Sequence, residues 1–186
     1  MDKFSVERIN DVVNEYKACS ACELTGRCHP KPMFKSKAKF MIVIDYPSAK
    51  DEANDVMGNG GIWDTINKIL AEVGVSSKDV YITSLVKTPK PTGGKFSNQT
   101  LNECPKWLER EIAELRPSLI VALGGQTVKY LTGLVASHAN AQVVYDEKRQ
   151  CNILVGGNPN AMFFRPEVAE KLIEVLAKIP DLLPST

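Results

Sequence analysis

The chain has 186 residues, of which 44% are hydrophobic and 24% are charged, and its formal net charge is +1. This length can bury a substantial core and the composition is typical of a soluble globular protein, so we predict a single domain over residues 1–186. No apolar run reaches the roughly 20 residues of a membrane span and the charged opening does not resemble a signal peptide, so we expect a cytoplasmic protein without membrane contact.

Hydrophobic periodicity and turn residues predict alternating helices and strands. In chain order these are a helix at 5–16, a strand at 39–45, a helix at 61–74, a strand at 80–86, a helix at 98–115, a strand at 118–123, a helix opening at Gly124-Gly125, a pair of strands at 141–146 and 151–156, and a final helix at 165–179. An irregular cysteine-rich stretch follows the first helix, and we expect residues 1–37 to pack on the domain.

The alternation of strands and helices predicts the fold class. The strands are continuously apolar and lack a two-residue period, which indicates a mostly parallel sheet covered by helices on both faces. In such sheets ligands bind beyond the carboxyl ends of the strands. These ends fall at residues 44–48, 83–91, 123–125 and 156–160, so we expect the functional residues there.

Five motifs resemble those of one family over almost the whole chain. They are "CSACEL" (19–24), "IDYPS" (44–48), "YITSLVKT" (81–88), "LRPSLIVALGGQTVKYL" (115–131) and "NPNAMFFRP" (158–166). Their order and spacing resemble the uracil-DNA glycosylase superfamily, and specifically its iron–sulfur-containing family 4. The resemblance implies a three-layer α/β/α sandwich around a mostly parallel four-stranded sheet.

The residues that carry chemistry in that family differ in this chain. Asp45 stands where the family has Glu, Ser84 where it has Asn, and Asn158 where it has His, while Thr88 replaces a cysteine of the cluster. The framework motifs are kept and the chemical ones are altered. The resemblance therefore implies DNA binding with uracil excision weakened or lost.

Four positions are candidates for the chemistry of base excision, which needs an extruded base, a positioned water and a donor to the base. Asp45 could orient the water or could be an ordinary turn residue. Asn158 can donate a hydrogen bond but cannot carry a proton. Tyr46 and Ser84 are expected in the base pocket, where the Tyr46 ring would fill the pocket or stack on a base, or would simply pack.

A second group of residues is expected to contact DNA. A net charge of +1 neither indicates nor excludes this, because a local basic groove can lie on a neutral protein. The resemblance implies that the loop after the last strand inserts apolar side chains into the duplex, although helix packing is the alternative. The candidates are Lys87, Lys90 and Lys95 for phosphate contacts, Met162, Phe163 and Phe164 for the wedge, and Arg165 beside it.

The cysteines allow three interpretations. Cys19, Cys22 and Cys104 match three cluster ligands of the family, and Cys28 lies near enough in sequence to replace the ligand lost at Thr88. We therefore predict a [4Fe–4S] cluster held by Cys19, Cys22, Cys28 and Cys104. A zinc site completed by Cys28 or His29 is the alternative, and the absence of any metal is the third interpretation.

These observations favour a DNA-binding protein of the uracil-DNA glycosylase superfamily that acts in DNA repair or replication. Its expected partners are DNA and replication or repair proteins such as a DNA polymerase. An active glycosylase that removes uracil or another modified base is the alternative. A protein-interaction module without a role on DNA is a third possibility.

Overall fold

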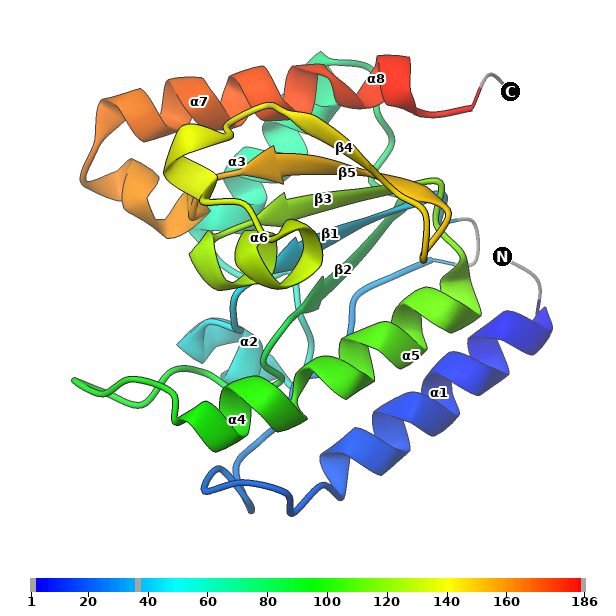
Figure 1. The fold of residues 1–186 in the computed structure, drawn as a ribbon, viewed down its shortest axis with the longest axis vertical. Helices are drawn as coiled ribbons and strands as arrows, with labels where there is room; N and C mark the ends of the chain where they lie inside the picture. The colour runs from blue at the N-terminus through cyan, green and yellow to red at the C-terminus, as the bar shows by residue number, and fades with distance from the viewer. Residues whose placement is uncertain (1–2, 36–37, 185–186) are drawn as a thin grey trace.

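The computed structural model describes residues 3–35 and 38–184. Over these residues it contains a five-stranded sheet in the order β2-β1-β3-β5-β4 (Figure 1). The strands are β1 (Phe40–Ile44), β2 (Val80–Ser84), β3 (Leu119–Leu123), β4 (Val143–Asp146) and β5 (Cys151–Gly156). β1, β2, β3 and β5 run parallel, and β4 pairs antiparallel with β5. The mostly parallel sheet is confirmed, but it is one strand larger than the four expected.

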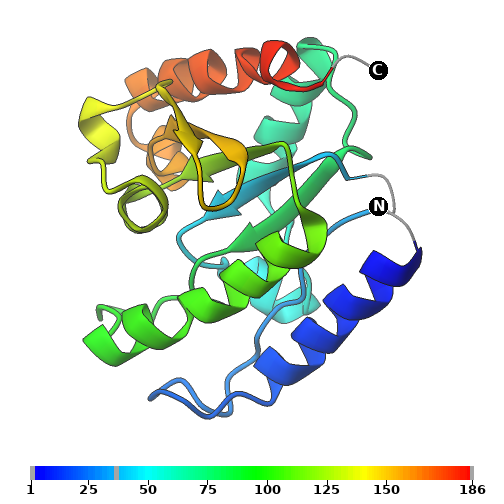
Figure 2. The same cartoon turned by 45° about the vertical axis from the view of Figure 1, so that its right-hand side comes forward.

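Helices cover both faces of the sheet and make three layers (Figure 2). The helical elements are α1 (Lys3–Lys17), α2 (Ala49–Asn54), α3 (Gly61–Glu72), α4 (Asn98–Glu103), α5 (Pro105–Leu115), α6 (Gly125–Thr132), η1 (Ala136–His138), η2 (Pro159–Phe163), α7 (Pro166–Ala177) and α8 (Ile179–Leu182). One core cluster joins the sheet to α1, α5 and α6, and another joins it to α3, α7 and α8. The predicted sandwich is therefore confirmed.

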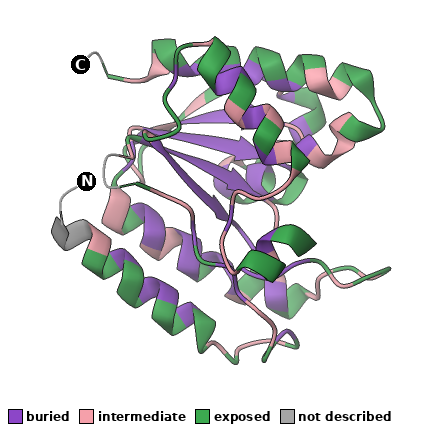
Figure 3. Ribbon diagram, turned by 180° about the vertical axis from the view of Figure 1, so that it is seen from behind, coloured by how far each residue is buried: buried purple, intermediate pink, exposed green. Residues whose placement is uncertain are grey.

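The strand residues alternate between the two cores. Met41 and Val43 belong to the cluster with α1 and α5, whereas Phe40, Ile42 and Ile44 belong to the cluster with α3 and α7. All residues of β1, β2 and β3 are buried (Figure 3). A strand buried on both faces needs apolar residues at every position, which explains the missing two-residue period.

Two helical details differ from the expectation. The single helix expected at 98–115 is two helices, α4 and α5, because Pro105 has no N–H to continue the hydrogen-bond ladder and starts α5 instead. The short helix α2 was not predicted. It begins with a capping box, in which Ser48 Oγ accepts from the Asp51 N–H at 3.1 Å and the Asp51 carboxylate accepts from the Ser48 N–H at 2.8 Å.

The helix α1 packs along α5, next to the sheet (Figure 1). The rings of Tyr16 and Trp107 meet edge to face with centroids 6.3 Å apart, and Arg110 donates to both carboxylate oxygens of Glu15 at 2.6 and 2.7 Å. In the described part of the chain no helix is long and apolar enough to span a membrane.

Candidate functional site at the carboxyl ends of the strands

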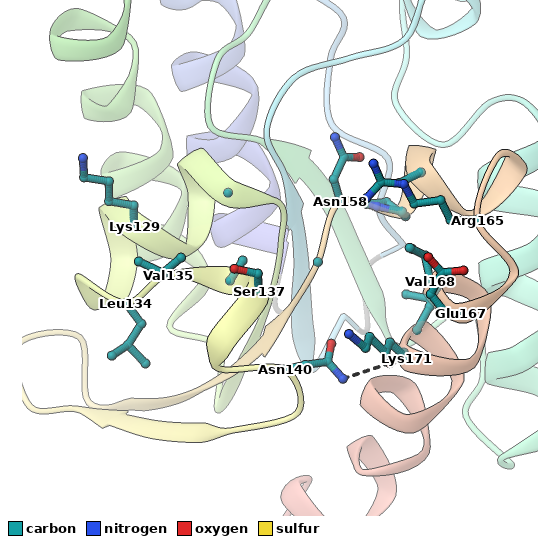
Figure 4. Close-up of a pocket in the computed structure, with 16 residues that line it drawn as sticks. Lys129, Leu134, Val135, Ser137, Asn140, Asn158, Arg165, Glu167, Val168 and Lys171 are labelled. Atoms are coloured by element: carbon teal, nitrogen blue, oxygen red, sulfur yellow. Dashed lines mark hydrogen bonds between the residues drawn. The ribbon is translucent and has the colours of Figure 1, made fainter.

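Two cavities lie on either side of the η2 turn, beyond the carboxyl ends of the strands, and Pro159 lines both. The first, of about 330 Å³, lies between the loop after β1 and the start of α3, and we call it the motif-loop cavity. The second, of about 460 Å³, lies among α6, η1, η2 and α7, and we call it the α6/α7 cavity (Figure 4). Clefts at this edge of an open α/β sheet are where ligands are expected.

Asp45, the expected water-orienting residue, caps α6. Its Oδ1 accepts from the Thr127 N–H at 2.8 Å and from Thr127 Oγ1 at 2.9 Å. A Cβ on Gly124 would lie 2.4 Å from the Asp45 carboxyl carbon, so glycine is needed for this approach. Burial raises the pKa of Asp45, although the bonds from Thr127 act in the opposite direction. Asp45 does not line either cavity, and its carboxylate is engaged with a helix N-terminus.

The two expected base-pocket residues have different surroundings. Tyr46 lines the motif-loop cavity, and its ring packs edge to face against Phe96 with centroids 5.5 Å apart. Ser84 is 1% exposed and lines neither cavity. Its Oγ is a buried oxygen for which no hydrogen-bond partner is present among the described residues. The structure thus brings Tyr46, and not Ser84, to a cavity wall.

Lys87 corrects an expectation, because it is buried and not a surface cation. Its Nζ donates to Thr83 Oγ1 at 2.8 Å, to the Ser84 carbonyl at 2.8 Å and to Glu111 Oε2 at 2.7 Å. Burial lowers the pKa of the Lys87 ammonium, and the nearby Glu111 carboxylate counteracts that effect. An ammonium enclosed in this way cannot reach a DNA phosphate.

Lys90 and Lys95 are exposed on residues 88–97, which we call the basic loop. The basic loop lies between β2 and α4 and projects from the body of the molecule on the side where the parallel strands end (Figure 1). These two lysines, unlike Lys87, are placed where a phosphate backbone can reach them.

The η2 turn presents aromatic side chains to solvent. Phe163 is 58% exposed and Phe164 is 87% exposed, while Met162 packs against the core on the α3 side. The Phe163 ring lies over Gly61, since a Cβ there would be 3.4 Å from Cζ. Phe163 and Phe164 are adjacent, and contiguous exposed apolar side chains are a feature of binding surfaces.

Asn158 and Arg165 flank this turn and both line the α6/α7 cavity (Figure 4). Asn158 Oδ1 accepts from the Asn160 N–H at 2.9 Å, so the side chain caps η2. Asp45 therefore faces α6, whereas Asn158 lies at the start of the η2 turn. The two expected catalytic residues do not line a common cavity.

Asp51 is a site residue that the sequence analysis missed. It is fully buried, and besides the cap of α2 it accepts from the Asn59 N–H at 2.9 Å. It thereby ties residues 44–48 to the glycine loop at 58–61, which together form walls of the motif-loop cavity. The S-x-x-D pattern of Ser48 and Asp51 was the available signal.

The predicted four-cysteine site is not assembled. In the regions that the structure describes, no three Cys, His, Asp or Glu side chains are grouped so that they could hold a metal ion. Cys28, the expected replacement ligand, donates a hydrogen bond from its thiol to Asp55 Oδ1 at 3.4 Å. Cys104 is buried with Leu24 and Val86, and Cys22 packs against this cluster. Thr88 offers a hydroxyl, which is a poor ligand for iron–sulfur clusters. Without a fourth thiolate beside Cys19, Cys22 and Cys104, the described residues do not supply the ligand set of a [4Fe–4S] cluster.

A mostly parallel sheet with helices on both faces is the fold that the motifs led us to expect for the uracil-DNA glycosylase class. Residues 32–178 match the family described as "Uracil DNA glycosylase superfamily". The chain therefore belongs to the uracil-DNA glycosylase superfamily.

Individual relatives agree with this assignment. The chain is 24% identical to a type-4 uracil-DNA glycosylase of Archaeoglobus fulgidus, over 95% of this chain and 94% of that protein. It is 25% identical to a type-4 uracil-DNA glycosylase of Saccharolobus solfataricus, over 97% of this chain and 88% of that protein. It is also 27% identical to a DNA polymerase of Bacillus phage SP01, over 88% of this chain but only 18% of the polymerase.

Proposed function

We propose that this protein binds DNA through the carboxyl edge of its sheet and acts in DNA repair or replication, with uracil excision weakened or lost. The observation that carries the proposal is the η2 turn, where Phe163 and Phe164 are exposed between the two cavities. Apolar side chains presented in this way can enter a base step and unstack it. Arg165, at the end of the turn, and Lys90 and Lys95 of the basic loop supply phosphate contacts.

Weak excision follows from the position of the polar groups. A glycosylase needs a carboxylate that orients water and a donor that stabilises charge on the departing base. The Asp45 carboxylate is hydrogen-bonded to Thr127, and Ser84 is sealed in the interior. Asn158 remains near the cavities but cannot carry positive charge. The [4Fe–4S] cluster and the zinc ion of the sequence analysis are not part of the proposal, because the cysteines do not fit them.

An active glycosylase is the second candidate. The motif-loop cavity, of about 330 Å³, is large enough for a nucleobase, and Tyr46 at its wall offers a ring for stacking. In this candidate, binding of the base displaces the Asp45 side chain from α6 so that it can orient the water, or another group orients the water. The names of the type-4 relatives support this candidate.

Association with a DNA polymerase is the partner that we propose. The support is the polymerase of Bacillus phage SP01, in which the matching segment is a part of the polymerase chain itself. The related unit in this protein would then serve the same machinery. A protein-interaction module without DNA contact is the contrary outcome.

The test combines binding with excision on uracil-containing single-stranded and duplex oligonucleotides. We expect salt-dependent binding and no strand breaks above background after alkaline treatment. Phe164→Ala should weaken duplex binding by about tenfold, since one stacked base is worth roughly 1–3 kcal/mol. Tyr145→Ala is the matched control, because Tyr145 is 55% exposed but lies on the edge strand β4. Efficient excision that Asp45→Asn abolishes would overturn the proposal, as would the lack of binding at low salt.

A further inference from the structure

The residues around the cysteines contact both ends of the basic loop. We call residues 18–31 the cysteine segment, and they lie between α1 and β1. We infer that the cysteine segment is a metal-independent clamp that holds the basic loop in position. Its function is thus to present Lys90 and Lys95, and not to carry a cluster.

The first contact is at the start of the loop, at the position where the family has a ligand. Thr88 is fully buried, and its Oγ1 is hydrogen-bonded to His29 Nδ1 at 2.6 Å. His29 is itself only 7% exposed. Arg27 adds a hydrogen bond from its guanidinium to the Pro89 carbonyl at 3.3 Å. Thr88, which stands where the family has a cysteine, is therefore hydrogen-bonded to a buried side chain, His29, and not to a metal ion.

The second contact is at the end of the loop. The Glu23 carboxylate accepts from Ser97 Oγ at 2.7 Å, from the Ser97 N–H at 3.3 Å and from Thr100 Oγ1 at 2.9 Å. Gln99 Nε2 donates to the Ala21 carbonyl at 2.8 Å. Three hydrogen bonds converge on one carboxylate, so Glu23 fixes the start of α4.

The segment has its own anchors on the rest of the domain. Tyr16 donates from its hydroxyl to the Pro30 carbonyl at 3.0 Å. The backbone of Lys31 accepts from the Met57 N–H at 2.9 Å and donates to the Asp55 carbonyl at 3.3 Å. The Cys28 thiol adds its bond to the Asp55 side chain. These bonds attach the cysteine segment to the domain without using a metal ligand.

An apolar cluster fills the space between the two contacts. Leu24, Val86 and Cys104 are buried together, and Tyr46 and Phe96 pack against them. Cys104 thus serves as a small hydrophobic residue, which is a common use of a free thiol. Phe96 belongs to the basic loop, so the cluster attaches the loop directly to the segment.

Metal content tests the metal-independent part of the inference without any DNA. The full chain is produced with iron and zinc in the medium, purified without oxygen, and measured by elemental analysis and visible absorption. We expect iron and zinc far below one ion per chain, and an unfolding midpoint that a chelator does not change. About one zinc ion or one iron–sulfur cluster per chain would overturn the inference.

Amide hydrogen exchange tests the clamp itself. Glu23→Gln should accelerate exchange of the Ser97 amide and of the amides in the first turn of α4 several-fold, because it removes the charge from the acceptor that holds Ser97 and Thr100. Thr88→Val, which keeps the shape and removes the hydroxyl, should act at the start of the loop. Glu15→Gln is the matched control, since its ion pair with Arg110 lies on α1 and α5. Unchanged exchange in both Glu23→Gln and Thr88→Val would refute the clamp, whether or not the protein binds DNA.

Discussion

Removing the charge of Glu111 should destabilise the protein severely. The side chains of Lys87 and Glu111 are 2% and 0% exposed, and their charged atoms are 2.7 Å apart. Glu111→Gln leaves the Lys87 ammonium in the interior with neutral acceptors alone, which are Thr83 Oγ1, the Ser84 carbonyl and the amide oxygen introduced at position 111. Breaking a buried ion pair from one side costs about 3–5 kcal/mol, and we expect a loss of this size in the free energy of unfolding.

The double variant makes the reasoning quantitative. Lys87→Met alone strands the Glu111 carboxylate and should cost a similar 3–5 kcal/mol, so two independent effects would sum to roughly 6–10 kcal/mol. Lys87→Met combined with Glu111→Leu removes both charges and fills the space with apolar atoms. Such replacements are often neutral, so we expect the double variant to lie within about 2 kcal/mol of the wild type.

Urea unfolding followed by tryptophan fluorescence measures these differences, because Trp63 and Trp107 are buried in the two separate cores. A cost below about 1 kcal/mol for Glu111→Gln would refute the buried pair. So would a double variant as unstable as the sum of the single variants. If folded Lys87→Met binds DNA with a smaller dependence on salt concentration than the wild type does, Lys87 contacts a DNA phosphate and the buried pair is refuted.

Three further predictions concern the surroundings of Asp45 and the basic loop. Burial raises the pKa of Asp45 from 3.8, so the folded state binds this proton more tightly than the unfolded state does. The stability of the wild type relative to Asp45→Asn should therefore rise as the pH falls from 7 through the raised pKa. Thermal unfolding at a series of pH values measures this difference, and a difference that does not change with pH would contradict the prediction. Gly124→Ala should lower the free energy of unfolding, measured in urea, by about 2–4 kcal/mol. The φ of 123° at this position is unfavourable for alanine, and the new methyl group meets the Asp45 carboxyl group. An unchanged free energy of unfolding would show that this contact is absent. Lys90→Ala and Lys95→Ala should each reduce the salt slope of DNA binding by about 1, and an unchanged slope would remove that lysine from the interface.

The local pattern of the chain was sufficient to predict the strands, although the sheet has one strand more than the four expected. Whether a strand is buried on both faces depends on its own residues, so β1, β2 and β3 were recognisable as short apolar runs. The same holds for the helices that carry one apolar stripe. The break between α4 and α5 depends on Pro105. Hydrophobic periodicity does not mark this break, because the apolar stripe continues across Pro105.

The site was predicted less completely, since a polar residue is defined by its partners. The sequence places Asp45, Asn158 and the two phenylalanines near the carboxyl edge of the sheet, because each follows an apolar strand. It does not reveal that Asp45 and Asn158 face different elements, or that the turn between the cavities holds Phe164 out in solvent. Those facts depend on how α6 and α7 settle on the sheet.

The sequence by itself thus determined the order of the main elements and the sandwich, because these depend on apolar patterns within short segments. Its motifs, and not the apolar pattern, carried the resemblance to the superfamily. Only the tertiary structure decided what the polar residues do. Asp45 meets Thr127 across 82 residues, Thr88 meets His29 across 59, and Lys87 meets Glu111 across 24. Burial and pairing set the charge and the reach of a side chain, and neither can be known until distant segments are brought together.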